Sequence, residues 1–156
     1  MTTETKLKGT YCLLIHLTHD SKITVGKLGE IDFKKGYYVY VGSALNSLEG
    51  RIKRHLRDDK KLFWHIDYLL ARENAEIVDV VFTIGDIKWE CDLASQIAEN
   101  GTKIDDFGCS DCKCNSHLFF FKNFLNSKDS CKHALKWLNL KYKTLEDLIK
   151  IKIETF

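Results

Sequence analysis

Two basic residues four positions apart, Arg51 and His55, stand in the most positively charged stretch of the sequence. Residues 51–61 hold six basic and two acidic residues, a net charge of +4, whereas the whole chain of 156 residues carries only +2. Positive charge concentrated on one helix is typical of a phosphate-binding surface. At about 100° per residue, Arg51 and His55 fall on the margin of the apolar stripe, where side chains can point along a groove. A solvated helix face is the alternative interpretation, because amphipathic helices are commonly basic on their outer side.

Glu90 is a carboxylate on the expected core-facing side of a second helix. The apolar residues of 87–99 form one arc of that helix, and Glu90 falls inside it. Burying a carboxylate is costly unless it is paired or coordinates a cation. The sequence therefore leaves two interpretations of Glu90, a metal ligand and a buried salt bridge to one of the basic residues.

Two tyrosines lie close to glycines in expected strands, in the segments Gly9-Thr10-Tyr11 and Tyr40-Val41-Gly42. Tyr40 shares a strand face with Gly42, which leaves space beside the ring. Ring packing alone would explain either tyrosine. Together with the arginine, the histidine and the glutamate, however, they form a set of side chains suited to chemistry on a phosphate.

This set resembles the GIY-YIG nuclease domain, and within it the archaeal-type branch described as Uri-superfamily endonucleases. Arg51 lies nine residues after Gly42, His55 follows one turn later, and Glu90 lies downstream, as the family's landmarks require. The resemblance covers residues 9–121 and is closest in the phrases GYYVYVGSA, RIKRHLR, FWHIDYLL, WECDLA and FGCSDCKCNSHLF. Thr10 and Val41 replace the two isoleucines that name the motif. The two motifs are separated by 28 residues because residues 18–35 add a strand to the usual short hairpin.

The resemblance implies a three-stranded antiparallel sheet flanked by helices, and phosphodiester hydrolysis with one divalent metal ion. Glu90 would hold Mg²⁺ or Mn²⁺, with water supplying most of the other ligands. Arg51 would neutralise the charge that develops on the phosphate. Tyr11 or Tyr40 would help to deprotonate the attacking water, assisted by His55. His65 corresponds to a further family histidine. Together with the basic residues that follow Arg51, it makes up the expected nucleic-acid contacts: Lys53, Arg54, Arg57, Lys60, Lys61 and His65.

Three of the six cysteines and one histidine lie within nine residues: Cys109, Cys112, Cys114 and His117. These side chains could hold a structural Zn²⁺, although their spacing is not a common zinc-finger pattern. A disulfide between a loop cysteine and Cys91 or Cys12 is one alternative, and buried free thiols are another. In each case we expect a structural role, bracing the loop that follows the helix bearing Glu90.

The first half of the chain is expected to form the strands and helices that position these residues. The apolar run 9–17, the turn at 18–21 and the short strand 23–28 predict a hairpin, and the β-branched and aromatic segment 36–42 predicts a third antiparallel strand. A helix is expected to follow Asn46, which with Glu49 makes a plausible capping box. A second helix is expected over 62–70.

In the second half, we expect a strand over 77–84 and a helix over 87–99. The run 117–121 is a strand or a buried aromatic plug, and two short helices over 130–138 and 144–153 close the chain. This order predicts an α+β fold of the GIY-YIG type, with a small, mostly antiparallel central sheet flanked by helices.

Length and composition predict a single domain over 1–156, with a core at about 9–121 and a C-terminal helical extension at about 128–156. No stretch approaches the roughly 18 apolar residues of a membrane span, and the start MTTETKLKG lacks a signal-like apolar region. We therefore expect a cytoplasmic protein whose partner is DNA and not a membrane. The expected function is metal-dependent endonuclease activity on DNA, in DNA repair. The alternatives are a non-catalytic nucleic-acid-binding module on the same fold and a zinc-braced interaction domain.

Overall fold

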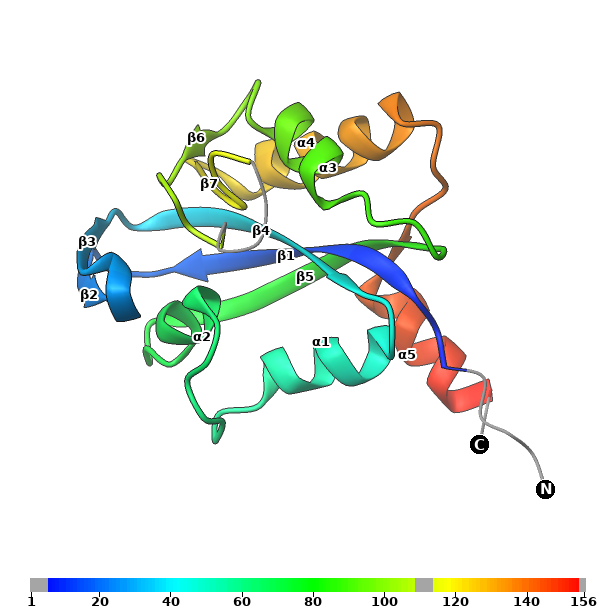
Figure 1. Cartoon of the computed structure of the whole chain (residues 1–156), viewed down its shortest axis with the longest axis horizontal. Coiled ribbons are helices and arrows are strands. Elements are labelled where there is room, and N and C mark those ends of the chain that lie inside the picture. Colours follow the sequence, from blue (N-terminus) through cyan, green and yellow to red (C-terminus); the bar gives the residue numbers. More distant parts are fainter. Residues whose placement is uncertain (1–5, 109–113, 155–156) are drawn as a thin grey trace.

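A six-stranded antiparallel sheet forms the centre of the computed structural model, which describes residues 6–108 and 114–154 (Figure 1). The strand order is β6-β7-β4-β1-β5-β8. The three long strands are β1 (Gly9–Leu17), β4 (Gly36–Ala44) and β5 (Ala75–Ile84), and they lie side by side. The sheet is widened by the short strands β7 (Leu118–Phe121), β6 (Thr102–Lys103) and β8 (Lys143–Thr144). The predicted α+β class is confirmed, and the run that ends at residue 121 is a strand.

Helices cover both faces of this sheet (Figure 1). One face carries α1 (Leu48–Leu56), α2 (His65–Leu70) and α5 (Leu145–Glu154), and the other carries α3 (Glu90–Ile97) and α4 (Phe124–Trp137). Strand β1 is buried on both sides, because alternate residues of a strand point to opposite faces. Tyr11 and Leu13 pack into the cluster beneath α1 and α2, whereas Cys12 and Leu14 pack beneath α3 and α4.

The segment between β1 and β4 forms a separate small hairpin, not a further strand of the main sheet. Strand β2 (Ser21–Thr24) pairs with β3 (Glu30–Phe33), across a short 3₁₀ turn in which Gly26 and Gly29 have φ values of 47° and 81°. The prediction that residues 23–28 pair with 9–17 was therefore wrong. The physical reason is that β4 and β5 already occupy both edges of β1, so that no hydrogen-bonding edge is left for a third neighbour.

Three helices begin later in the chain than predicted. Ser47, not Asn46, caps α1, because its hydroxyl accepts a hydrogen bond from the amide of Gly50 at 3.0 Å. The carboxylate of Glu49 accepts instead from the amide of Leu7. Helix α2 starts at residue 65 and not 62, and α3 starts at residue 90 and not 87. The backbone of the residue before each helix is extended at Trp64 and irregular at Trp89.

The C-terminal helices belong to the core of the fold. Helix α4 begins at Phe124 and contacts β1, β4, β5 and β7 as well as α3. Its Cys131, Ala134 and Leu135 are buried in the cluster beneath α3. The helical part after residue 121 is therefore one cover of the sheet, not an extension that lies outside the core. No helix in the described part of the chain is long and apolar enough to cross a membrane.

Helix α4 offers a matched pair of leucines for testing its place in the core. Leu135 is fully buried and Leu125 is 70 % exposed on the same helix. We expect Leu135→Ala to lower the free energy of unfolding by about 2–4 kcal/mol, because it removes buried apolar atoms and leaves a cavity. Leu125→Ala should change it by less than about 0.5 kcal/mol. Urea unfolding followed by circular dichroism measures both, and equal effects would contradict the packing described.

Candidate active site

Four of the five residues singled out in the sequence line one cleft of about 680 Å³. Tyr11 comes from β1, Tyr40 from the middle of β4, Arg51 from α1 and Glu90 from the start of α3. The cleft is completed by backbone and side chains of these residues: Gly42, Ser43, Leu45, Asn46, Trp64, Lys88, Cys91, Gly108 and His117. The fold thus brings together groups that are up to 106 residues apart in the chain, from Tyr11 to His117.

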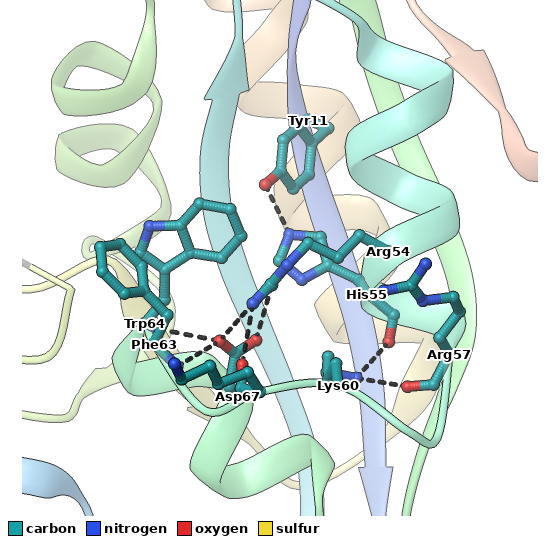
Figure 2. A network of polar contacts seen from close by, with 9 residues as sticks. Tyr11, Arg54, His55, Arg57, Lys60, Phe63, Trp64 and Asp67 are labelled. Atoms are coloured by element: carbon teal, nitrogen blue, oxygen red, sulfur yellow. Dashed lines mark hydrogen bonds and ion pairs between the residues drawn. The ribbon is translucent and has the colours of Figure 1, made fainter.

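The fifth residue, His55, lies behind Tyr11. Its Nε2 is 2.7 Å from the Tyr11 hydroxyl, and its ring is 98 % shielded from solvent (Figure 2). Burial lowers the pKa of His55 from 6.5 to about 3, and the Asp67 carboxylate only partly opposes this. The imidazole is therefore neutral near pH 7. With the ring proton on Nδ1, Nε2 accepts a hydrogen bond from the phenol.

Both tyrosines of the cleft are held in their neutral form. Burial raises the pKa of Tyr11 above its ordinary value of 10.0, and the positive charge of Arg51 only partly opposes this. Burial likewise raises the pKa of Tyr40. Gly42 lies opposite Tyr11 in the β1–β4 pair, and a Cβ atom added there would be 2.6 Å from the Tyr11 hydroxyl. The tyrosine ring therefore occupies the space that the glycine leaves open.

Arg51 is held in the cleft wall by two contacts. Its Nη1 donates to the backbone carbonyl of Ser43 at 3.1 Å, and its guanidinium lies 4.5 Å from the centre of the Trp64 ring. One hydrogen bond uses only part of the five-donor guanidinium. A planar donor group positioned in this way can bind two oxygens of a phosphate or carboxylate.

Glu90 lies in the first turn of α3, at the edge of the cleft. Its side chain is 24 % exposed, whereas Leu93, Ala94 and Ile97 form the buried side of the helix. Glu90 shares a helix face with these three residues, as the sequence predicted, but it is the first residue of α3, and its side chain lines the cleft. A carboxylate oxygen lies 3.7 Å from Nδ1 of His117, whose pKa is lowered by burial. Glu90 therefore presents its carboxylate to the cleft, and no lysine or arginine among the described residues forms an ion pair with it.

The threonine of the first motif holds the start of α3 in place. Thr10 is fully buried, and its hydroxyl donates to the carbonyl of Ile87 and accepts from the amide of Trp89. Because the Trp89 amide directly precedes Glu90, this hydroxyl ties the helix start to β1. The isoleucine of the motif could not make these bonds, and the replacement by threonine did not by itself predict them.

A buried ion pair below the cleft is the second feature that the sequence analysis missed. The carboxylate of Asp67 is fully buried and receives both terminal nitrogens of Arg54 at 3.0 Å (Figure 2). It also accepts from the amides of Phe63 and Trp64. These contacts hold the pKa of Asp67 below its ordinary value despite burial. Asp67 points about 100° away from the buried Ile66, which directly precedes it in α2, so apolar periodicity alone does not predict that its carboxylate is buried.

The remaining predicted nucleic-acid contacts have different surroundings. Lys53, Arg57 and Lys61 are exposed. The ammonium of Lys60 donates to the carbonyls of His55 and Arg57, at the end of α1 (Figure 2). His65 lies outside this cleft, and its Nδ1 accepts from the amide of Gly108. Three of the predicted contacts are therefore exposed cations of α1 and its exit, while Arg54 and Lys60 have partners within the fold.

The predicted cysteine cluster is described only in part. Cys109 and Cys112 lie outside the described residues. Cys114 forms a disulfide with Cys91, which was one of the alternatives left open by the sequence. Cys12 is a buried free thiol on β1. The disulfide and His117 lie next to Glu90 at the edge of the cleft.

The buried His55 predicts a specific pH dependence of stability. Below pH 6.5 the unfolded chain binds a proton at this ring that the folded chain binds only near pH 3, so the free energy of unfolding falls as pH falls. Between about pH 7.5 and about pH 5.0, His55→Gln should lose roughly 2 kcal/mol less than wild type. Urea titrations at both pH values measure this, with the exposed His133→Gln as control. Equal losses in wild type and His55→Gln would contradict the prediction.

Comparison with known sequences gives one match. No curated protein and no solved structure matches the chain. The sequence model described as "Domain of unknown function DUF123" matches residues 10–140. This range includes all five residues of the candidate site and helix α4. The chain belongs to the family described as Domain of unknown function DUF123.

Proposed function

We propose that this protein is a metal-dependent endonuclease that hydrolyses DNA phosphodiester bonds in the manner of the GIY-YIG nucleases, whose motifs it resembles. The observation that carries the proposal is the shared cleft. Tyr11, Tyr40, Arg51 and Glu90 line it, and His55 lies 2.7 Å behind the Tyr11 hydroxyl. A hydrolase for phosphodiesters needs an acid–base group, a cationic donor and a carboxylate around one phosphate, and this cleft supplies all three types.

The residues present fit one divalent cation of the magnesium class. Glu90 offers a partly exposed carboxylate at the edge of a cleft wide enough for water. Mg²⁺ keeps several of its waters and needs only one or two carboxylates from a protein. When bound, such an ion would polarise the phosphoryl oxygens and lower the pKa of a bound water. Glu90 would hold it.

Arg51 would bind the non-bridging oxygens of the scissile phosphate. The Ser43 carbonyl and the Trp64 ring fix its guanidinium before substrate arrives, so that little side-chain freedom is lost on binding. In the reaction, water attacks phosphorus and the bond to one bridging oxygen breaks, with extra negative charge on the phosphoryl oxygens in between. A fixed cation stabilises that charge more than it stabilises the substrate.

Tyr11 and His55 would act as a pair in removing the proton of the attacking water. The phenol can accept this proton while it passes its own to the neutral imidazole at 2.7 Å. The pKa of His55 is too low for this in the free protein, but the negative charge of a bound phosphate would raise it. The leaving bridging oxygen would take up a proton from solvent. Tyr40, which also lines the cleft, would position the phosphate or the water.

The surroundings of the cleft favour DNA as the substrate. The exposed cations Lys53, Arg57 and Lys61 belong to the stretch of +4 net charge that follows Arg51 along α1 and its exit. Contacts of this kind with neighbouring phosphates depend strongly on salt concentration and carry little sequence information. Damaged, branched and single-stranded DNA are therefore the substrates to be tested first.

The glutamate provides the decisive test. We expect Glu90→Gln to lower the rate of nicking of plasmid and labelled branched DNA, with Mg²⁺ or Mn²⁺, by about 100-fold or more, because the amide cannot replace the carboxylate as a ligand. Asp92→Asn is the matched control, because Asp92 is exposed on the same helix and does not line the cleft. It should cleave like wild type.

Two outcomes would contradict the nuclease proposal. Equal cleavage by wild type and Glu90→Gln would assign the activity to a contaminant. Salt-sensitive DNA binding without metal-dependent cleavage of any substrate would instead support a non-catalytic binding module.

The packing of Tyr11 against Gly42 predicts a second effect on the rate. A Cβ atom at Gly42 would lie 2.6 Å from both Cζ and Oη of Tyr11, so Gly42→Ala must displace the phenol. A displacement of this size can lower a rate by about 100-fold. Gly85→Ala, where nothing lies within 4 Å of the added atom, is the control. Single-turnover nicking rates and DNA affinity should be measured for both variants. Equal rates would show that the position of Tyr11 is irrelevant to cleavage.

A further inference from the structure

Three side chains with metal-binding chemistry gather at the edge of the cleft. Their ligand atoms, Sγ of Cys91, Sγ of Cys114 and an imidazole nitrogen of His117, all lie within 4.8 Å of one another. Cys91 is in the first turn of α3, and the other two residues lie in the segment that leads into β7. The cluster therefore joins two elements that are separated by more than 20 residues in the chain.

The donor set matches that of zinc. Two thiolates and an imidazole are preferred zinc ligands, with bond lengths of about 2.3 Å to sulfur and about 2.0 Å to nitrogen. In a tetrahedron with these bonds, the ligand atoms are roughly 3.5–4 Å apart. In the structure the two sulfur atoms are joined in the disulfide, and the imidazole nitrogen lies within 4.8 Å of both, so that after reduction side-chain rotations would bring the three atoms to these separations.

We propose that the reduced chain binds one zinc ion through Cys91, Cys114 and His117. Each thiol loses its proton to solvent on binding, no electron is transferred, and the fourth position is taken by water. The disulfide between the same cysteines is the metal-free, oxidised state. The two states exclude each other, because a sulfur atom that is bonded to sulfur is not a thiolate ligand. Reducing conditions therefore favour the zinc-bound state.

This zinc site would stabilise the position of the candidate metal ligand. Glu90 directly precedes Cys91, and its carboxylate lies 3.7 Å from Nδ1 of His117. Zinc would therefore fix the first turn of α3 against the segment before β7. The proposal does not depend on nuclease activity, because metal binding is measured on the protein alone.

Metal analysis of the full chain tests the proposal. Wild type purified under reducing conditions without chelator should contain about one zinc ion per chain, and Cys91→Ser should contain less than about a tenth of that. Cys131→Ala is the matched control, because Cys131 is a buried free thiol on α4, and it should retain the zinc. Cobalt substitution should give wild type a thiolate-to-metal charge-transfer absorption that Cys91→Ser lacks.

Alkylation of wild type gives a second readout that needs no variant. Bound zinc should protect Cys91 and Cys114 from iodoacetamide, and removal of the metal by a chelator in the presence of reductant should expose both, as followed by peptide mass spectrometry. Reduced wild type without zinc, or protection that does not depend on the metal, would overturn the proposal. Full zinc content in Cys91→Ser would also overturn it, because the metal would then be held by other cysteines.

Discussion

The carboxylate of Asp67 fixes the geometry of the cleft, although it does not line the cleft itself. It is buried completely, and it is tolerated there because Arg54 and two backbone amides donate to it. Removing one partner would leave an uncompensated charge in the interior. The pair ties α1 to α2, and the two amide contacts hold the segment before α2. It also holds Trp64 between the guanidinium groups of Arg51 and Arg54, at 4.5 and 4.1 Å. The orientation of the Arg51 side chain therefore depends on the Arg54–Asp67 ion pair, which does not itself line the cleft.

Strand β1 positions the residues on the other side of the cleft. It is the only described strand in the main sheet that pairs along its whole length with two long neighbours. Because successive side chains alternate between faces, Tyr11 reaches the pocket beneath α1, where it meets His55. Thr10 points to the opposite face and ties down the start of α3. Two adjacent residues thus position the acid–base pair and the carboxylate.

Much of the fold could be predicted because it depends on local pattern. The long strands, the apolar face of α1 and the α+β class followed from periodicity and β-branched composition. The errors arose where a partner outside the segment decided the outcome. Residues 23–28 could not join β1 because both of its edges were taken. Helix α3 begins three residues later than predicted, because the hydroxyl of Thr10 binds the backbone of Ile87 and Trp89 before it. The burial of Asp67 was not predicted either, because its partner Arg54 had been interpreted only as a surface cation.

The sequence by itself determined which side chains are present, which of them share a helix or strand face, and that positive charge is concentrated over residues 51–61. Only the tertiary structure decided which of those charges remain available. Arg54 is neutralised by Asp67, and Lys60 is bound to the carbonyls at the end of α1. The physical reason is that residue spacing sets local conformation, whereas an ion pair or a cleft depends on which distant segments pack together and exclude water.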